Sequence, residues 1–197
     1  MCDENKHDVL LSKGESATSS HADLYVVSIN KFLILFVITI GGYAVYWSYR
    51  NWVFYRDARG AEVTPFMSGI FWPFFIVPLF ERINAGLQTT GEVYRWYPTL
   101  RGVSLIGVTV LSFIAPLFLD APADPRLAFA ISATTLAVTT TCFIGAQRAI
   151  NRLAGDPEGT SNREFTTANI VWIMLGGVYW VVAFGIMLFG DVGYGDV

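Results

Sequence analysis

Hydrophobic residues along this chain gather in long uncharged runs, and the charged residues are confined to the short stretches between them. Four segments contain no Asp, Glu, Lys, Arg or His: Phe32–Tyr49, Gly102–Leu119, Leu127–Gln147 and Phe165–Gly190. At about 1.5 Å of rise per residue, helices of this length cross the ~30 Å hydrocarbon layer of a bilayer. The pattern predicts an all-α integral membrane protein with four transmembrane helices, at about 32–49, 102–119, 127–147 and 168–190.

A fifth apolar run, Val63–Phe80, contains three prolines. Pro65 follows Thr64 and makes a good helix start, because a proline in the first helical position loses no hydrogen bond. Pro73 and Pro78 would each remove a backbone donor from a helix interior, which a lipid-facing span tolerates poorly. We therefore expect two short helices that meet near Pro73 in a re-entrant or interfacial hairpin. The alternative is a fifth transmembrane helix.

The positions of the basic residues give an expected orientation. Counted over all loops, the lysines and arginines are unequally divided between the two sides of the membrane. The division is the same in the four-span and five-span arrangements, so the totals do not favour either one. Arg50, Arg56 and Arg59 directly follow the first run, whereas Lys31, with Lys13 at the margin, precedes it. Because basic residues close to a span favour the cytoplasmic side, this comparison predicts that both termini lie outside.

Composition limits the domain organisation and the function classes. Residues 1–30 are expected to be a disordered acidic tail, and 31–197 a single helical membrane domain. The formal net charge is −3 and no basic patch is present, so a nucleic-acid partner is not expected. Cys2 lies at the N-terminus and Cys142 lies inside a predicted span, so they are not expected to pair. They also match no metal-site spacing. No cofactor is expected either.

Aromatic residues crowd the end of the first run, in the stretch Gly41–Trp52. Tyr and Trp rings favour the headgroup level of a membrane, and arginines reach phosphates just beyond it. This interpretation makes an interfacial anchor of six residues: Tyr43, Tyr46, Trp47, Tyr49, Arg50 and Trp52. The same rings could instead pack against the run 63–80, or form a ligand-binding aromatic box.

The apolar run followed by Gly-x-Tyr-x-x-Tyr-Trp-x-Tyr and a basic residue resembles a group of small bacterial multi-pass membrane proteins. That group is classed only as a domain of unknown function. The similarity covers roughly Lys31–Gly60, and Gly41, Tyr43, Tyr46, Trp47 and Tyr49 are the matching positions. It implies a location in the bacterial inner membrane and supplies no chemistry.

The third run has small residues at every fourth position: Ala133, Ala137, Thr141, Gly145 and Ala149. Small residues at this spacing allow another helix to approach closely, so this ridge is expected to be a helix-packing surface. Beside it lies a hydroxyl stripe that includes Thr135 and Thr139, which could line a pore. Threonine in a membrane helix more often bonds back to its own backbone, and packing is the favoured interpretation.

No residue pattern predicts a reaction. The four predicted spans lack the ionisable groups that proton-coupled pumps use, and no phosphate-binding loop, dinucleotide fingerprint or nucleophile motif is present. We expect no catalytic, cofactor-binding or metal-binding residues. The favoured function is a non-enzymatic scaffold, accessory or regulatory subunit, in contact with the lipid bilayer and with a membrane-protein partner or further copies of itself. The alternatives are a small channel or transporter component built around the third span, and an enzyme acting on a lipid headgroup.

Overall fold

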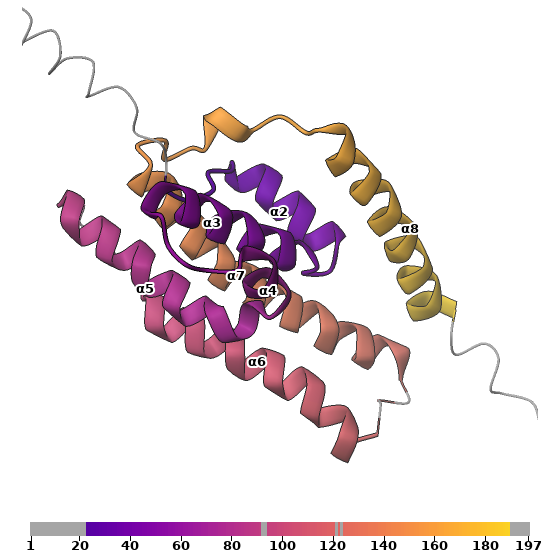
Figure 1. Cartoon of the computed structure of the whole chain (residues 1–197). Coiled ribbons are helices and arrows are strands. Elements are labelled where there is room, and N and C mark those ends of the chain that lie inside the picture. Colours follow the sequence, from indigo (N-terminus) through magenta and orange to yellow (C-terminus); the bar gives the residue numbers. More distant parts are fainter. Residues whose placement is uncertain (1–22, 92–93, 121, 123, 190–197) are drawn as a thin grey trace, which may run out of the picture.

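The computed structural model describes residues 23–91, 94–120, 122 and 124–189, which fold into helices joined by short loops (Figure 1). A short 3₁₀ turn, Thr160–Asn162, lies between the last two helices. No strand occurs in these residues. In chain order, the helices are α2 (Ile29–Ile38), α3 (Tyr43–Arg59), α4 (Pro65–Ile70), α5 (Trp72–Thr90), α6 (Pro98–Phe118), α7 (Pro125–Leu153) and α8 (Thr167–Phe189).

Three helices, α6, α7 and α8, are long and apolar enough to cross a membrane. They correspond to the last three predicted spans. Helix α7 is longer than expected, because it continues past Gln147 to Leu153 and carries its C-terminal turns into the protein core. Four or five spanning helices are not confirmed.

The first predicted span, 32–49, is not one continuous helix. Helix α2 ends at Ile38, and Ile40 and Gly41 adopt left-handed backbone angles before α3 begins. The ring of Phe32 then contacts the rings of Tyr43 and Trp47, with centroids 5.6 and 6.3 Å apart, so α3 folds back along α2. The reversal is favourable at Gly41, which has φ +80°, because glycine has no Cβ to strain. The run therefore forms a helical hairpin.

The proline-bearing run, 63–80, divides at Phe71 into the short α4 and the 19-residue α5. The break lies two residues before the expected position, and the second helix is much longer than predicted. Pro73 does not interrupt α5, because it occupies the first turn, where the missing N–H costs little. Pro78 lies inside α5 without ending it, contrary to the prediction. Helix α4 packs on α3, where the Ser48 hydroxyl donates to the Ser68 carbonyl at 3.2 Å.

The core is aromatic and lies where α2, α3 and α5 meet the C-terminal half of α7. Phe143 of α7 is at its centre, with its ring 5.1 Å from Phe36, 5.3 Å from Trp47 and 5.3 Å from Trp72. Such ring pairs add to the stabilisation that burial provides. By contrast, α8 has no buried residue, so its apolar surface is left for lipid or for other helices.

The expected tail, 1–30, falls largely outside the described residues, since residues 1–22 are not among them. Its remaining part does not behave as a tail. Residues 23–28 run without regular secondary structure, and the side chains of Leu24, Tyr25 and Val27 belong to the core. The chain therefore enters the bundle as an extended segment before α2 begins.

Candidate functional site

Amide side chains hold the extended segment 23–28 in place. Asn51 accepts a hydrogen bond from the Tyr25 N–H at 3.1 Å, and Asn151 donates to the Val27 carbonyl at 3.0 Å. Gln147 donates to the Tyr25 carbonyl at 3.2 Å and to the Asn151 side chain at 2.7 Å. An extended segment cannot pair its own backbone groups, and a buried unpaired group is costly. The amides supply the missing partners.

Helix α8 lies at one edge of the molecule and touches the other helices mainly around its middle (Figure 1). There, Gly176 approaches the backbone and side chain of Ile38 at the end of α2. The indole N–H of Trp180 donates to the carbonyl of Val37 at 3.1 Å. Towards its N-terminus, α8 is separated from α3 and α4, and this separation opens a cavity.

That cavity, which we call the lateral groove, has a volume of about 840 Å³. Its lining is predominantly apolar, with four tyrosines and a few hydroxyl and amide side chains. Helices α2, α3, α4 and α8 all contribute, and the lining includes Leu35, Val45, Ile70, Trp172 and Leu175. The volume lies in the range of cavities that bind small molecules.

A second cavity of about 430 Å³, the polar pocket, adjoins the lateral groove at the N-terminus of α8. Tyr46, Thr166 and Asn169 line both cavities, so the two cavities lie side by side. The polar pocket also contains the cations Lys31 and Arg50. Among the described residues, no carboxylate side chain lines it.

Lys31 is buried, with only 3% of its surface exposed. Its ammonium donates to the side-chain oxygen of Asn162 at 2.7 Å and to the carbonyl of Glu164 at 2.6 Å. Both acceptors are uncharged. An ammonium has three donors, so this geometry leaves one without an assigned partner within the described residues. A buried cation of this kind favours an anion nearby.

Arg50 lies across the polar pocket on α3. Its guanidinium carbon is 5.2 Å from the centre of the Tyr25 ring and 5.1 Å from that of Phe54. These cation–π contacts hold the charge without neutralising it. The Nε atom is buried and has no hydrogen-bond partner within the described residues. Arg50 therefore brings a second positive charge that no carboxylate among the described residues balances.

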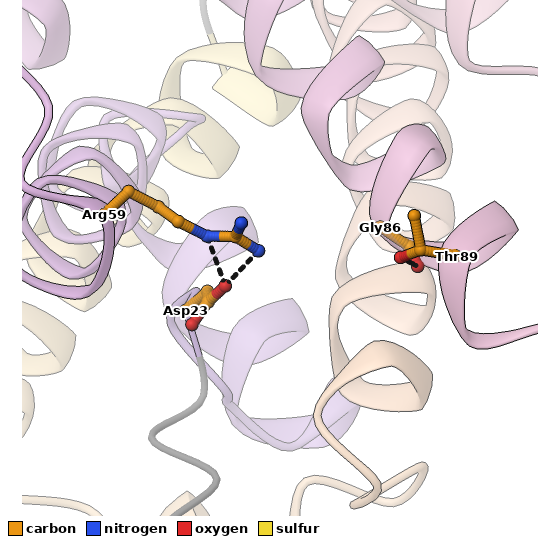
Figure 2. Close-up of polar contacts among 4 residues, drawn as sticks. All are labelled: Asp23, Arg59, Gly86 and Thr89. Carbon is orange, nitrogen blue, oxygen red and sulfur yellow. Dashed lines mark hydrogen bonds and ion pairs between the residues drawn. The ribbon is translucent and has the colours of Figure 1, made fainter.

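A third cavity, about 440 Å³, opens at the end of the bundle where α3 and α5 finish. Figure 2 shows its polar contacts: Arg59 forms an ion pair with Asp23, with the closest N–O distance at 2.6 Å, and the Thr89 hydroxyl donates to the Gly86 carbonyl. Arg82 also lines it and lies between the rings of Trp52 and Tyr55. Because Asp23 neutralises Arg59, this end pocket has less unbalanced charge than the polar pocket.

The predicted interfacial anchor is only partly what the structure contains. Tyr43, Trp47 and Trp52 are buried in the protein core and cannot contact lipid headgroups, so this part of the prediction is wrong. The physical reason is the reversal between α2 and α3, which turns these rings inward. Tyr46 and Tyr49 are exposed, at 45% and 37%. The alternative of packing holds for the buried rings: the ring of Trp52 contacts Phe75 of α5.

The predicted small-residue ridge is a contact surface at its C-terminal end only. Gly145 and Ala149 are buried, whereas Ala133 is half-buried and Ala137 and Thr141 are exposed. The Arg101 guanidinium of α6 lies against Gly145, which has no side chain to obstruct it. Arg101 also donates to the Thr141 carbonyl at 2.6 Å. The space beside Gly145 is therefore filled by an arginine side chain and not by the apolar face of another helix.

Of the hydroxyl stripe, Thr139 bonds back to its own helix, as predicted, and so do the neighbouring threonines. The hydroxyls of Thr134, Thr139, Thr140 and Thr141 each donate to a carbonyl three or four residues earlier, at 2.6–3.0 Å. Hydroxyls committed to the backbone are poorly placed to coordinate passing ions or water. This geometry favours packing over a pore.

Most residues of the site were not identified from the sequence, although Tyr46 and Arg50 were assigned to the interfacial anchor. Asn51, Gln147, Asn151 and Asn162 were not singled out, and Lys31 was used only to infer orientation. One signal was present: Gln147 and Asn151 are four residues apart, on one face of a helix that otherwise buries apolar residues. Polar residues on a buried face require partners, but the partner segment could not be deduced from spacing.

Comparison of the chain with protein-family models, with curated proteins and with solved structures found no match. The resemblance to small bacterial membrane proteins of unknown function therefore stays a prediction. Among the described residues, no group of three or more His, Cys, Asp or Glu side chains could hold a metal ion.

Proposed function

We propose that the chain is a non-enzymatic accessory protein of the bacterial inner membrane, with α6, α7 and α8 as its spanning helices. The observation that carries this proposal is the exposed apolar surface of α6 and α8. Phe113, Leu117 and Phe118 of α6 are 76–80% exposed, and α8 exposes apolar residues on all but the face that packs against α2 and α7. Large exposed apolar faces that the protein itself does not cover are typical of surfaces for lipid or partner helices.

In this arrangement the arginine-rich end of the bundle of α2–α5 lies on the inner side of the membrane. Ten of the eleven lysines and arginines in the described residues belong to the end where α6 begins and α7 finishes, and Arg126 alone lies at the other end. Such an imbalance favours placing the arginine-rich end inside. The hairpin of α2 and α3 then enters the membrane and returns to the inner side. The N-terminal side of the chain therefore lies inside, contrary to the expectation that both termini lie outside.

Cysteine labelling tests the orientation. In a background with Cys2 and Cys142 replaced by serine, Asn30→Cys and Ala58→Cys should both react only with reagent added from the inner side. Both parent side chains are exposed and lie on either side of the α2–α3 hairpin. Asp120→Cys, in the turn before α7, serves as the outer-side control. Labelling of Asn30→Cys from outside would instead restore the four-span arrangement.

Photo-crosslinking tests the accessory function. A photoreactive amino acid at Phe113 or Leu117 should form an adduct with one defined membrane protein or with a second copy of this chain. The same amino acid at Leu105, which is buried, should give no such adduct. If the exposed positions yield only lipid adducts under all expression conditions, the proposal of a partner-binding role fails.

A further inference from the structure

We propose that the lateral groove and the polar pocket together bind one phospholipid with an anionic headgroup. The headgroup occupies the polar pocket beside Lys31 and Arg50, and an acyl chain follows the lateral groove. This inference goes beyond the accessory function, because it assigns a ligand to a cavity within the chain and needs no protein partner.

Charge complementarity is the first argument for this ligand. Two cations, one of them 97% buried, face a pocket to which the described residues contribute no carboxylate. The Lys31 ammonium has a donor without an assigned partner among the described residues, and the Arg50 guanidinium lines the same pocket. Phosphate oxygens accept hydrogen bonds from both types of donor. Asn169 and Thr166 add polar groups at the junction of the two cavities.

The depth of the groove is the second argument. Along α8 the lining runs from Ala168 to Tyr179, which is about 16 Å of helix at 1.5 Å per residue. Half of a ~30 Å hydrocarbon layer is about the same length. The polar pocket lies at the first turn of α8, where a spanning helix leaves the headgroup region. A lipid of the adjacent leaflet therefore matches the site in both length and polarity.

Helix α8 contacts α2 towards the end of the groove that is farther from Asn169, which is the third argument. Gly176 approaches Ile38, and Trp180 donates to the Val37 carbonyl, so α8 and α2 meet near the middle of the membrane. An extended chain that enters beside Asn169 would end there. A partner helix that crosses the whole bilayer would find only half of its length accommodated.

Binding to the purified full-length chain in detergent micelles tests the proposal, for example by native mass spectrometry. Phosphatidylglycerol should bind at least about tenfold more tightly than phosphatidylcholine with the same acyl chains, since a buried charge contact contributes more than about 1.4 kcal/mol. Lys31→Met should abolish this preference. Leu175→Trp should weaken binding of both lipids by filling the groove, whereas Val178→Trp, at an exposed α8 position outside the groove, should not.

The controls separate other occupants from this one. Arg148→Met removes an exposed charge at the same end of the molecule and should leave the preference intact. If it weakens phosphatidylglycerol as much as Lys31→Met does, general charge attraction explains binding and the proposal is overturned. It is also overturned if inorganic phosphate competes fully with the lipid, or if Leu175→Trp disrupts association of copies while lipid binding is unchanged. If the Lys31→Met variant does not fold, Arg50→Met replaces it and should likewise abolish the preference for phosphatidylglycerol. The two tryptophan variants are then used as before.

Discussion

Gln147 and Asn151 lie one turn apart on α7, and a 2.7 Å hydrogen bond between their side chains joins them into one unit that holds the segment before α2. Through this unit the last turns of α7 bind the carbonyls of Tyr25 and Val27. On its other side, Gln147 accepts a hydrogen bond from the indole N–H of Trp47. The pair therefore connects α7 to two parts of the chain, the segment 23–28 and Trp47, which lie more than 90 residues earlier in the sequence. In this way it positions Lys31 at the pocket.

Replacing Asn151 with leucine should destabilise the protein strongly. The Val27 carbonyl would lose its donor and the Gln147 amide its acceptor, both in buried surroundings. A buried group left unpaired costs about 1–3 kcal/mol, so the midpoint of thermal unfolding in detergent should fall by several degrees. Arg148→Gln on the exposed side of the same turn is the control and should change little. Equal midpoints for the two variants would contradict the role given to Asn151.

Gly159 should be far less tolerant of alanine than Gly155, although both have positive φ angles, +65° and +72°. Left-handed backbone alone costs a side-chain-bearing residue about 1–2 kcal/mol. At Gly155 an added Cβ would meet nothing, whereas at Gly159 it would lie 2.6 Å from the backbone of Val27 and Ser28. Gly159→Ala should therefore lower the unfolding midpoint clearly more than Gly155→Ala. Similar losses for both would indicate that segment 23–28 is not held by this loop.

The absence of charge and the length of the runs were enough to predict α6, α7 and α8, because uncharged runs of about 20 residues have few alternatives to a membrane helix. The run 32–49 has the same composition but folds into a hairpin. Its reversal depends on Ile40 and Gly41 in left-handed conformations, and the Thr39 hydroxyl accepts a hydrogen bond from the Tyr43 N–H at 2.9 Å. Hydropathy does not predict such local backbone geometry, although a glycine pair such as Gly41–Gly42 is typical of a turn.

The candidate site was harder to predict because its parts come from distant segments. Lys31 meets Asn162 and Glu164 across more than 130 residues. A lysine at the edge of an apolar run is ordinarily exposed, and only the packed loop after α7 buries this one. Sequence spacing predicts which residues share a helix face, but not which loop covers that face.

Acid should destabilise the loop that carries Gly159 and Asn162. The carboxylate of Asp156 accepts hydrogen bonds from the backbone N–H groups of Ser161 and Thr160, which lower its pKa from 3.8 to about 2. Because the folded pKa is lowered, this contribution to stability is complete above pH 3.8 and is lost as the pH falls towards about 2. The unfolding midpoint of the wild type should fall through this window more steeply than that of Asp156→Asn. Parallel profiles would exclude this contribution.

The attachment of α8 to α2 should depend on Gly176 and not on its neighbour Gly177. A side chain at Gly176 would collide with the backbone and side chain of Ile38, whereas one at Gly177 would meet no atom within 4 Å. Gly176→Leu should therefore push α8 away from α2, break the Trp180–Val37 hydrogen bond, and cost about 1–3 kcal/mol, as overpacking of a close contact does. Trypsin cleavage after the exposed Arg163, in the connection to α8, should become faster in detergent for this variant. Gly177→Leu keeps the helix equally apolar and should be cleaved at the wild-type rate. Equal cleavage rates for the two leucine variants would mean that α8 is held by contacts other than this one.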